Sequence, residues 1–188
     1  MSALPAAFTL ADARAAGLRK DQVYQGVEAG EFERVGRGVY VAVGSLDPSL
    51  ESLAAATAVQ PSATMCLTSA LVRHDLSDEI PIGTDIALPR GVRHPAGFDH
   101  VTWHSFDPTT FQIGREALDE NFGLFTYSPE RTVVDVFRLV HQQGSDTAIT
   151  ALKRWLHQPG HHPSALLSMA ASFPKVHSSI GSVLEVLT

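Results

Sequence analysis

The chain has 188 residues, of which 44% are hydrophobic and 18% charged, enough for one medium domain or for a small and a medium one. Its formal net charge of −6 gives no overall signal for nucleic acid. The charge is unevenly distributed: residues 1–45 contain five basic and five acidic residues, whereas residues 46–188 contain nine and fifteen. Any DNA-binding surface is therefore expected to be local and to lie in the first segment.

The cysteine content and the N-terminal stretch indicate the cellular compartment. Cys66 is the single cysteine, which excludes an intramolecular disulfide, and its apolar neighbours favour a buried, inert thiol. The opening stretch MSALPAAFTL lacks a basic region, and no apolar run is long enough to span a bilayer. The chain is therefore interpreted as cytoplasmic, with no membrane partner.

The first predicted elements are two short helices. Thr9 followed three residues later by Asp12 is typical of a capping box, so a helix is expected through the alanine-rich stretch that follows. A second helix is predicted over residues 20–29, because Val23 and Val27 form an apolar pair at i, i+4 spacing.

A compact hairpin is predicted next. Its strands are expected at residues 32–35 and 38–43, joined at Gly36-Arg37, where glycine supplies a positive φ. The order of helix, turn, helix and hairpin is that of a winged helix-turn-helix.

A turn-rich linker at residues 44–48 divides the chain into a winged helix-turn-helix domain, residues 1–45, and a second domain, residues 49–188. The second domain is expected to be mixed α/β with a helical C-terminus, which makes the fold class α+β. Helices are predicted at residues 50–59, 63–74, 128–141, 146–157, 163–172 and 176–187. Strands are predicted at residues 84–88, 100–106, 111–118 and 123–127.

The second helix of a helix-turn-helix meets the major groove with its N-terminal half, so polar residues there are candidates for DNA contacts. The residues expected to face DNA are Arg19, Lys20, Gln22 and Gln25 on this helix, with Arg34 and Arg37 on the hairpin. Glutamine pairs with adenine and arginine with guanine, while lysine suits a phosphate. Asp21 and Glu28 would repel phosphate, which leaves open a winged helix that binds only protein.

Histidines and a basic loop are further candidates. His100 and His104 share a predicted strand face, but no histidine spacing in the chain supplies the convergent ligands of a zinc site. The stretch ALPRGVRHPAG places Arg90, Arg93 and His94 in one loop of an otherwise acidic domain. This loop is either simply solvated or a contact to nucleic acid or to an acidic partner.

The stretch SPERTVVDVFRL begins with Ser128 and Pro129, a strong helix start. Arg131 and Asp135 follow at i, i+4 on an otherwise apolar helix, with Glu130 as a second carboxylate. Two interpretations remain: a half-buried ion pair that orients the helix, or a contact to a partner. Catalysis would need a partnered base with a metal or nucleophile, and no lysine follows at nuclease-like spacing, so neither enzyme activity nor a cofactor is expected.

These motifs together resemble a known family. The order Thr-Leu-x-x-Ala-x-x-x-Gly-Leu, a short helix with Tyr24, and GEFERVGRGVYV resemble the winged helix of AbiEi-family antitoxins. The likeness continues through LTSALVRHDL, IALPRG, FTYSPERTVVDVFR and ALKRWL, and so covers almost the whole chain. Family members usually have a full helix before the one at Thr9, whereas here only eight residues precede it.

The resemblance implies two tasks in a toxin–antitoxin system. The winged helix would repress the operon by binding its promoter DNA, and the C-terminal domain would neutralise a nucleotidyltransferase-like toxin. Carried over by position, the DNA-facing residues are the six named above, and the characteristic polar residues of the antitoxin domain are Glu130, Arg131 and Asp135. The alternatives are a protein-interaction antitoxin without DNA affinity, a stand-alone transcriptional regulator, or an enzyme acting on the toxin or on nucleic acid.

Overall fold

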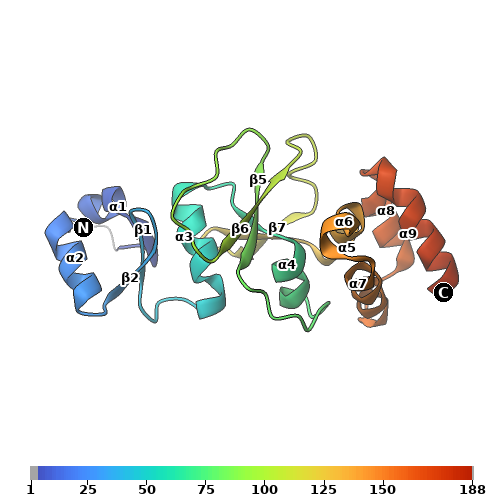
Figure 1. The fold of residues 1–188 in the computed structure, drawn as a ribbon, viewed down its shortest axis with the longest axis horizontal. Coiled ribbons are helices and arrows are strands. Elements are labelled where there is room, and N and C mark those ends of the chain that lie inside the picture. Colours follow the sequence, from blue (N-terminus) through green and yellow to red (C-terminus); the bar gives the residue numbers. More distant parts are fainter. Residues whose placement is uncertain (1–3, 188) are drawn as a thin grey trace.

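The computed structural model, which describes residues 4–187, is an elongated α+β molecule with a small N-terminal unit at one end and a layer of helices at the other (Figure 1). The N-terminal unit contains β1 (Ala7–Thr9), α1 (Leu10–Ala15), α2 (Lys20–Glu28), β2 (Phe32–Gly36) and β3 (Val39–Ala42). Its three strands form an antiparallel sheet in the order β1-β3-β2. The predicted winged helix-turn-helix and the α+β class are thus confirmed.

The predicted start of α1 is confirmed, but the turn of the wing lies elsewhere. Thr9 accepts a hydrogen bond from the backbone N–H of Asp12 at 3.3 Å, and the Asp12 carboxylate accepts one from the Thr9 N–H at 2.8 Å. The prediction that the hairpin turns at Gly36-Arg37 is wrong. Gly36 belongs to β2, and the glycine with positive φ is Gly38, at 75°.

The strand β1 was not predicted. It pairs with β3, and it buries Phe8 completely between the rings of Phe32 and Tyr40, at centroid distances of 5.0 and 5.7 Å. The short segment before Thr9 therefore closes the small core as a strand instead of a helix. A strand of three residues is too short to show the alternation of apolar and polar side chains, so only its pairing with β3 defines β1.

The central part of the chain is built around a five-stranded mixed sheet. Its helices are the 3₁₀ turn η1 (Pro48–Leu50), α3 (Glu51–Val59) and α4 (Leu67–Arg73). Its strands are β4 (Thr64–Met65), β5 (Thr84–Pro89), β6 (Val101–Phe106), β7 (Arg115–Asp119) and β8 (Leu124–Tyr127), in the order β6-β5-β4-β8-β7. The pairs β5–β6 and β4–β8 are parallel, and the other two pairs are antiparallel.

The helix α3 connects the winged helix to this sheet. Ile86 and Leu88 of β5 pack in one apolar cluster with Leu53 of α3, whereas Ala87 between them packs in the cluster on the opposite face. The α3 cluster also contains Val39 and Val41 from the wing sheet. The outer face of the wing is therefore covered by α3, and the predicted winged helix-turn-helix and second domain share a core.

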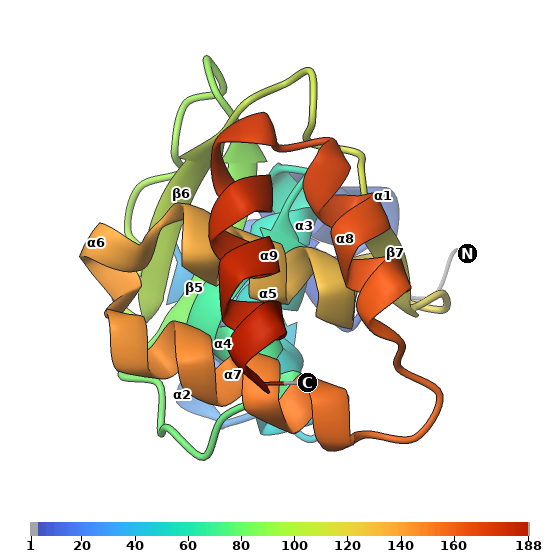
Figure 2. The same cartoon turned by 90° about the vertical axis from the view of Figure 1, so that its right-hand side faces the viewer.

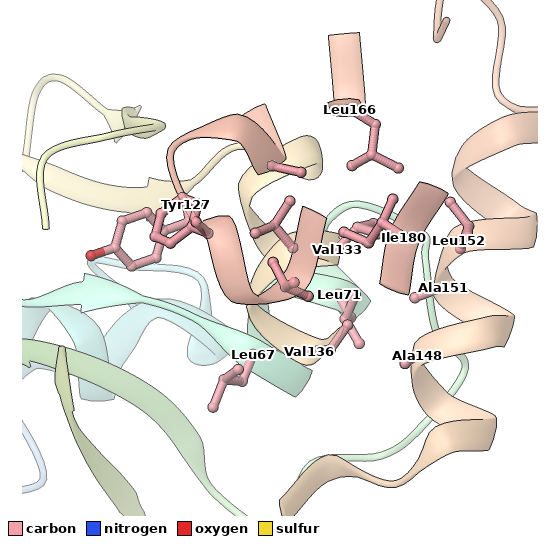
Figure 3. Packing of buried hydrophobic residues seen from close by; sticks show 14 of the residues in the cluster. Leu67, Leu71, Tyr127, Val133, Val136, Ala148, Ala151, Leu152, Leu166 and Ile180 are labelled. Atoms are coloured by element: carbon pink, nitrogen blue, oxygen red, sulfur yellow. The ribbon is translucent and has the colours of Figure 1, made fainter. Parts of the chain in front are cut away.

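Five helices complete the chain: α5 (Pro129–Arg138), α6 (Val140–Gln143), α7 (Ser145–His157), α8 (Pro163–Ala171) and α9 (Pro174–Leu187). Seen from the C-terminal end, α9 crosses in front of α5, with α8 to its right and α7 below (Figure 2). Val133 and Val136 of α5 are fully buried among side chains of α4, α7 and α9, such as Leu71, Leu152 and Ile180 (Figure 3). The predicted start of α5 is confirmed, because Ser128 accepts from the Arg131 N–H and Pro129 opens the helix.

Three predicted boundaries in the second domain are wrong. The helix expected from residue 63 begins only at Leu67, which has a φ of 44°, because residues 64–65 form β4 at the centre of the sheet. The strand expected at residues 111–118 begins at Arg115. The helix expected to reach residue 141 ends at Arg138. None of the helices within residues 4–187 is long and apolar enough to cross a membrane.

Candidate nucleic-acid interface

The helix α2 is held by its apolar side and presents its polar side to solvent. Val23 is fully buried, and Val27 packs against the same small core. Gly26 permits close packing on β2, because a Cβ at this position would lie 2.5 Å from the ring of Phe32. Every residue expected to face DNA is exposed: Arg19, Lys20, Gln22, Gln25, Arg34 and Arg37.

The structure brings one helix candidate together with both wing candidates, whereas Arg19, Gln22 and Gln25 lie outside the depression that they share. Lys20 of α2 and both wing arginines, Arg34 and Arg37, line one surface depression of about 580 Å³. Tyr24 of α2 lies in the same depression, is 45% exposed, and has the Lys20 ammonium 5.4 Å from its ring centroid. Three cations around an exposed aromatic side chain suit the sugar-phosphate backbone of a nucleic acid. Glu28 lines the depression too and opposes this charge.

Tyr24 and Tyr40 were missed as site residues by the sequence prediction. Tyr24 stands four residues after Lys20 on the predicted helix, and this spacing was the available signal. Tyr40 comes from β3 and is 3% exposed, so only the fold brings it to the depression. Burial raises the pKa of the Tyr40 hydroxyl, with a smaller contribution from Tyr24, so this phenol stays neutral at physiological pH.

Two of the candidate side chains already have partners at the start of α2. The Arg19 guanidinium donates to both carboxylate oxygens of Asp21 at 3.2 Å, in an exposed ion pair. This guanidinium holds the pKa of Asp21 below its usual value. The side-chain oxygen of Gln22 accepts from the Arg19 N–H at 2.8 Å and so caps the helix. Asp21 therefore competes with a phosphate or a base for the Arg19 guanidinium.

The Asp21→Ala substitution is therefore expected to strengthen binding to duplex DNA. It removes a negative charge from the DNA-facing end of α2 and frees Arg19, so the affinity at 0.1 M salt should rise by up to about eightfold, the contribution of one phosphate contact. Fluorescence anisotropy with labelled duplex DNA measures this change. Glu120→Ala, in the exposed turn between β7 and β8, removes the same charge away from the winged helix and should have little effect. An unchanged or lower affinity for Asp21→Ala would contradict the competition between Asp21 and DNA.

The polar pair predicted on α5 is completely enclosed. Arg131 and Asp135 are 0% exposed, and Arg131 Nε lies 3.0 Å from Asp135 Oδ2. The other carboxylate oxygen of Asp135 lies 2.8 Å from Nη2 of Arg138. Burial raises the pKa of Asp135, and the two guanidinium groups oppose this shift. The arrangement is a buried ion cluster, which agrees with an ion pair that orients the helix.

Arg131 also holds segments that are remote in the sequence. Its Nη1 donates to the carbonyl oxygens of Thr110 and Ile113, at 2.8 and 2.5 Å. Its guanidinium lies 4.3 Å from the ring centroid of Tyr127 and 4.6 Å from that of Phe173. One side chain thus connects α5 to the turn before β7, to β8, and to the residue before α9.

Glu130 is the one member of the predicted antitoxin set that reaches solvent. Its side chain is 25% exposed and lies 3.8 Å from Nδ1 of His161. The ring of His161 packs edge-on against Trp155 at 4.8 Å. Glu130 therefore lies at a surface formed by α5, α7 and the loop before α8.

Of the remaining histidine and cysteine candidates, His104 has a local partner and Cys66 is buried. His104 Nε2 lies 2.8 Å from Asp85 Oδ1, on the neighbouring strand. Cys66 is 1% exposed, and burial raises the pKa of its thiol well above the usual value. Among residues 4–187, no three His, Cys, Asp or Glu side chains are grouped so that they could hold a metal ion.

The N-terminal geometry defines a class of protein, one with a winged helix-turn-helix whose helix and wing present basic and polar side chains together. Residues 7–43 match the family described as "Transcriptional regulator, AbiEi antitoxin", which confirms for this segment the resemblance seen in the sequence. The chain is also similar in fold to the RV2827C protein from Mycobacterium tuberculosis, with a TM-score of 0.53 and 15% identity over 95% of this chain and 76% of that one. No curated protein matches the chain.

Proposed function

We propose that this chain is a cytoplasmic antitoxin that represses its own operon by binding promoter DNA and neutralises a nucleotidyltransferase-like toxin encoded beside it. The shared depression lined by Lys20, Arg34 and Arg37 carries the DNA-binding part of the proposal. The match of residues 7–43 to an antitoxin and transcriptional regulator family supports both parts. The proposed DNA contacts are Arg19, Lys20, Gln22, Gln25, Arg34 and Arg37, without a cofactor.

Binding to promoter DNA is tested by its salt dependence. Each phosphate neutralised by lysine or arginine contributes about −0.9 to the slope of log affinity against log salt, and roughly four contacts are available here. On that principle the winged helix should contribute about −3.6 to the slope for a duplex from the region upstream of the gene. If no binding is detected even at low salt, the chain does not repress by binding this DNA. A protein-interaction antitoxin then becomes the better proposal, and Asp21 and Glu28 on α2 favour that reading.

Toxin neutralisation is tested by co-expression with the neighbouring gene. Growth should be arrested by the neighbour alone and restored by co-expression of this chain. If this chain makes no difference to growth, the antitoxin role is wrong. Within the proposed set, Arg131 and Asp135 would act through the structure of the domain, because both are buried. Glu130 would contact the toxin directly, because it reaches solvent.

The Glu130→Gln substitution separates these two roles. It removes one charge at a partly exposed position, so the melting temperature should change little while rescue of growth is weakened. Asp146→Asn on the exposed first turn of α7 is a matched control and should leave rescue intact. Full rescue by Glu130→Gln would exclude Glu130 from the toxin contact.

A further inference from the structure

The tip of the wing is held by a loop of the central domain. A Cβ on Gly36 would lie 2.7 Å from the ring of Phe98, and a Cβ on Gly97 would lie 3.1 Å from the backbone nitrogen of Arg37. Gly97 has a φ of 79°, which L side chains rarely adopt. In Figure 1 the connection between β5 and β6 runs along the side of the sheet that faces the winged helix. The wing and this loop therefore present one continuous surface.

This loop is built on a fixed aromatic support. Trp103 of β6 packs against the ring of Phe98 at 5.5 Å and against the ring of His94 at 5.8 Å. His94 Nε2 also lies 3.0 Å from Ser105 Oγ, and the Arg90 N–H donates to the Phe106 carbonyl oxygen at 2.7 Å. Because one indole contacts both rings, the stretch that contains His94 is anchored close to the wing contact at Phe98.

The loop carries a local excess of positive charge. Residues 86–98 contain two arginines and no acidic residue, although Asp85 and Asp99 flank them and the domain is acidic overall. Arg90 has only a loose ion pair, 3.9 Å from Asp107. Arg93 is exposed and makes no ion pair with any residue in the described part of the chain. Asp99 lines the groove between loop and wing, and Arg90 lies in a depression with Arg138 and Lys175 beside α9. Arg93 is therefore the cation of this loop that is suited to an anionic partner bound by the wing.

We propose that residues 92–94 of the central domain extend the DNA-binding surface of the winged helix, with Arg93 contacting a backbone phosphate of the duplex. This inference rests on the proposed function, since it requires that the winged helix binds DNA. Duplex DNA fits this surface because its phosphates repeat along the double helix and so extend beyond the part that the wing contacts. The loop lies directly beside the wing, through the contact between Gly97 and Arg37. A phosphate contact adds affinity for every sequence and carries no base preference.

The test compares Arg93→Ala with wild type on a duplex of about 40 base pairs, roughly four helical turns, from upstream of the gene. Loss of one phosphate contact should reduce the salt slope by about 0.9 and the affinity at 0.1 M salt about eightfold. The same loss is expected on a shuffled duplex of equal composition, because a phosphate contact does not read the bases. Arg93→Lys keeps the charge and should keep the slope. Lys153→Ala, an exposed lysine on α7 at the far end of the molecule, should behave as wild type.

The outcomes distinguish this inference from the proposed function. If wild type binds and Arg93→Ala alone has a lower slope, the loop belongs to the DNA surface. If wild type binds and Arg93→Ala has the same slope and affinity, the inference is overturned, while DNA binding by the winged helix stands. If wild type fails to bind at low salt, the proposed DNA function fails, and this inference fails with it. Because Arg93 is exposed, equal melting temperatures of variant and wild type should accompany all three outcomes.

Discussion

The Arg131→Ala substitution is expected to lower the free energy of unfolding by about 3–5 kcal/mol, because it leaves a buried carboxylate without its main partner. The variant also loses the donor to the carbonyl oxygens of Thr110 and Ile113, and the guanidinium between the rings of Tyr127 and Phe173. For a chain of this size the melting temperature should fall by roughly 6–20 °C. Differential scanning calorimetry and urea denaturation measure the two quantities.

The matched control is Arg154→Ala. Arg154 also pairs with an aspartate, Asp78, but this ion pair is exposed, so its loss should change the melting temperature little. Arg131→Ala is also expected to impair rescue from the toxin, as a consequence of the damaged fold. If Arg131→Ala kept the wild-type melting temperature and still lost antitoxicity, the ion-cluster explanation would be wrong and a direct contact role would replace it.

The stability loss of Arg131→Ala should also depend on pH. Removal of the Arg131 guanidinium lets burial raise the pKa of Asp135 further above its unfolded value of about 4. A carboxyl whose pKa is raised on folding stabilises the folded state when it is protonated. This stabilisation is fully present below the unfolded pKa and is lost as the pH rises through the folded pKa. The difference in stability between variant and wild type is therefore expected to be smaller near pH 4 than near pH 7.

The double substitution Arg19→Ala with Lys20→Ala is expected to abolish binding to promoter DNA at concentrations that half-saturate wild type. Both side chains are exposed at the N-terminal end of α2, where a recognition helix meets the groove. Two lost phosphate contacts reduce the salt slope by about 1.8 and the affinity at 0.1 M salt about 60-fold. Anisotropy titrations at several salt concentrations measure both effects.

The same double variant should still neutralise the toxin, because its substitutions lie in the winged helix and the proposed toxin contact lies on α5. The double variant Lys153→Ala with Lys175→Ala removes two exposed cations from the C-terminal helices and is the control for DNA binding. Loss of both DNA binding and neutralisation in Arg19→Ala with Lys20→Ala would show that the two tasks are not divided between the two parts of the chain.

The sequence predicted those elements whose signals lie within one helix or one turn. The capping box at Thr9, the apolar pair Val23 and Val27 on the inner side of α2, and the helix start at Ser128-Pro129 are all confirmed, because each depends on residues at most four positions apart. The i, i+4 spacing of Val23 and Val27 also predicted which side chains of α2 are exposed. The residues of β4 were predicted to be helical. Two residues are too few to show a strand pattern, and the strands that pair with them, β5 and β8, come later in the chain.

By itself, the sequence determined the winged helix and the α+β class, and it predicted the polar residues of both candidate sites. Only the tertiary structure decided that Arg131 and Asp135 are buried, since helices that follow α5 in the chain pack around it. Only the tertiary structure placed the basic loop beside the wing, through the contact between Gly36 and Phe98. Such contacts join residues far apart in the chain, and they form because apolar surfaces of separate elements must be buried against one another.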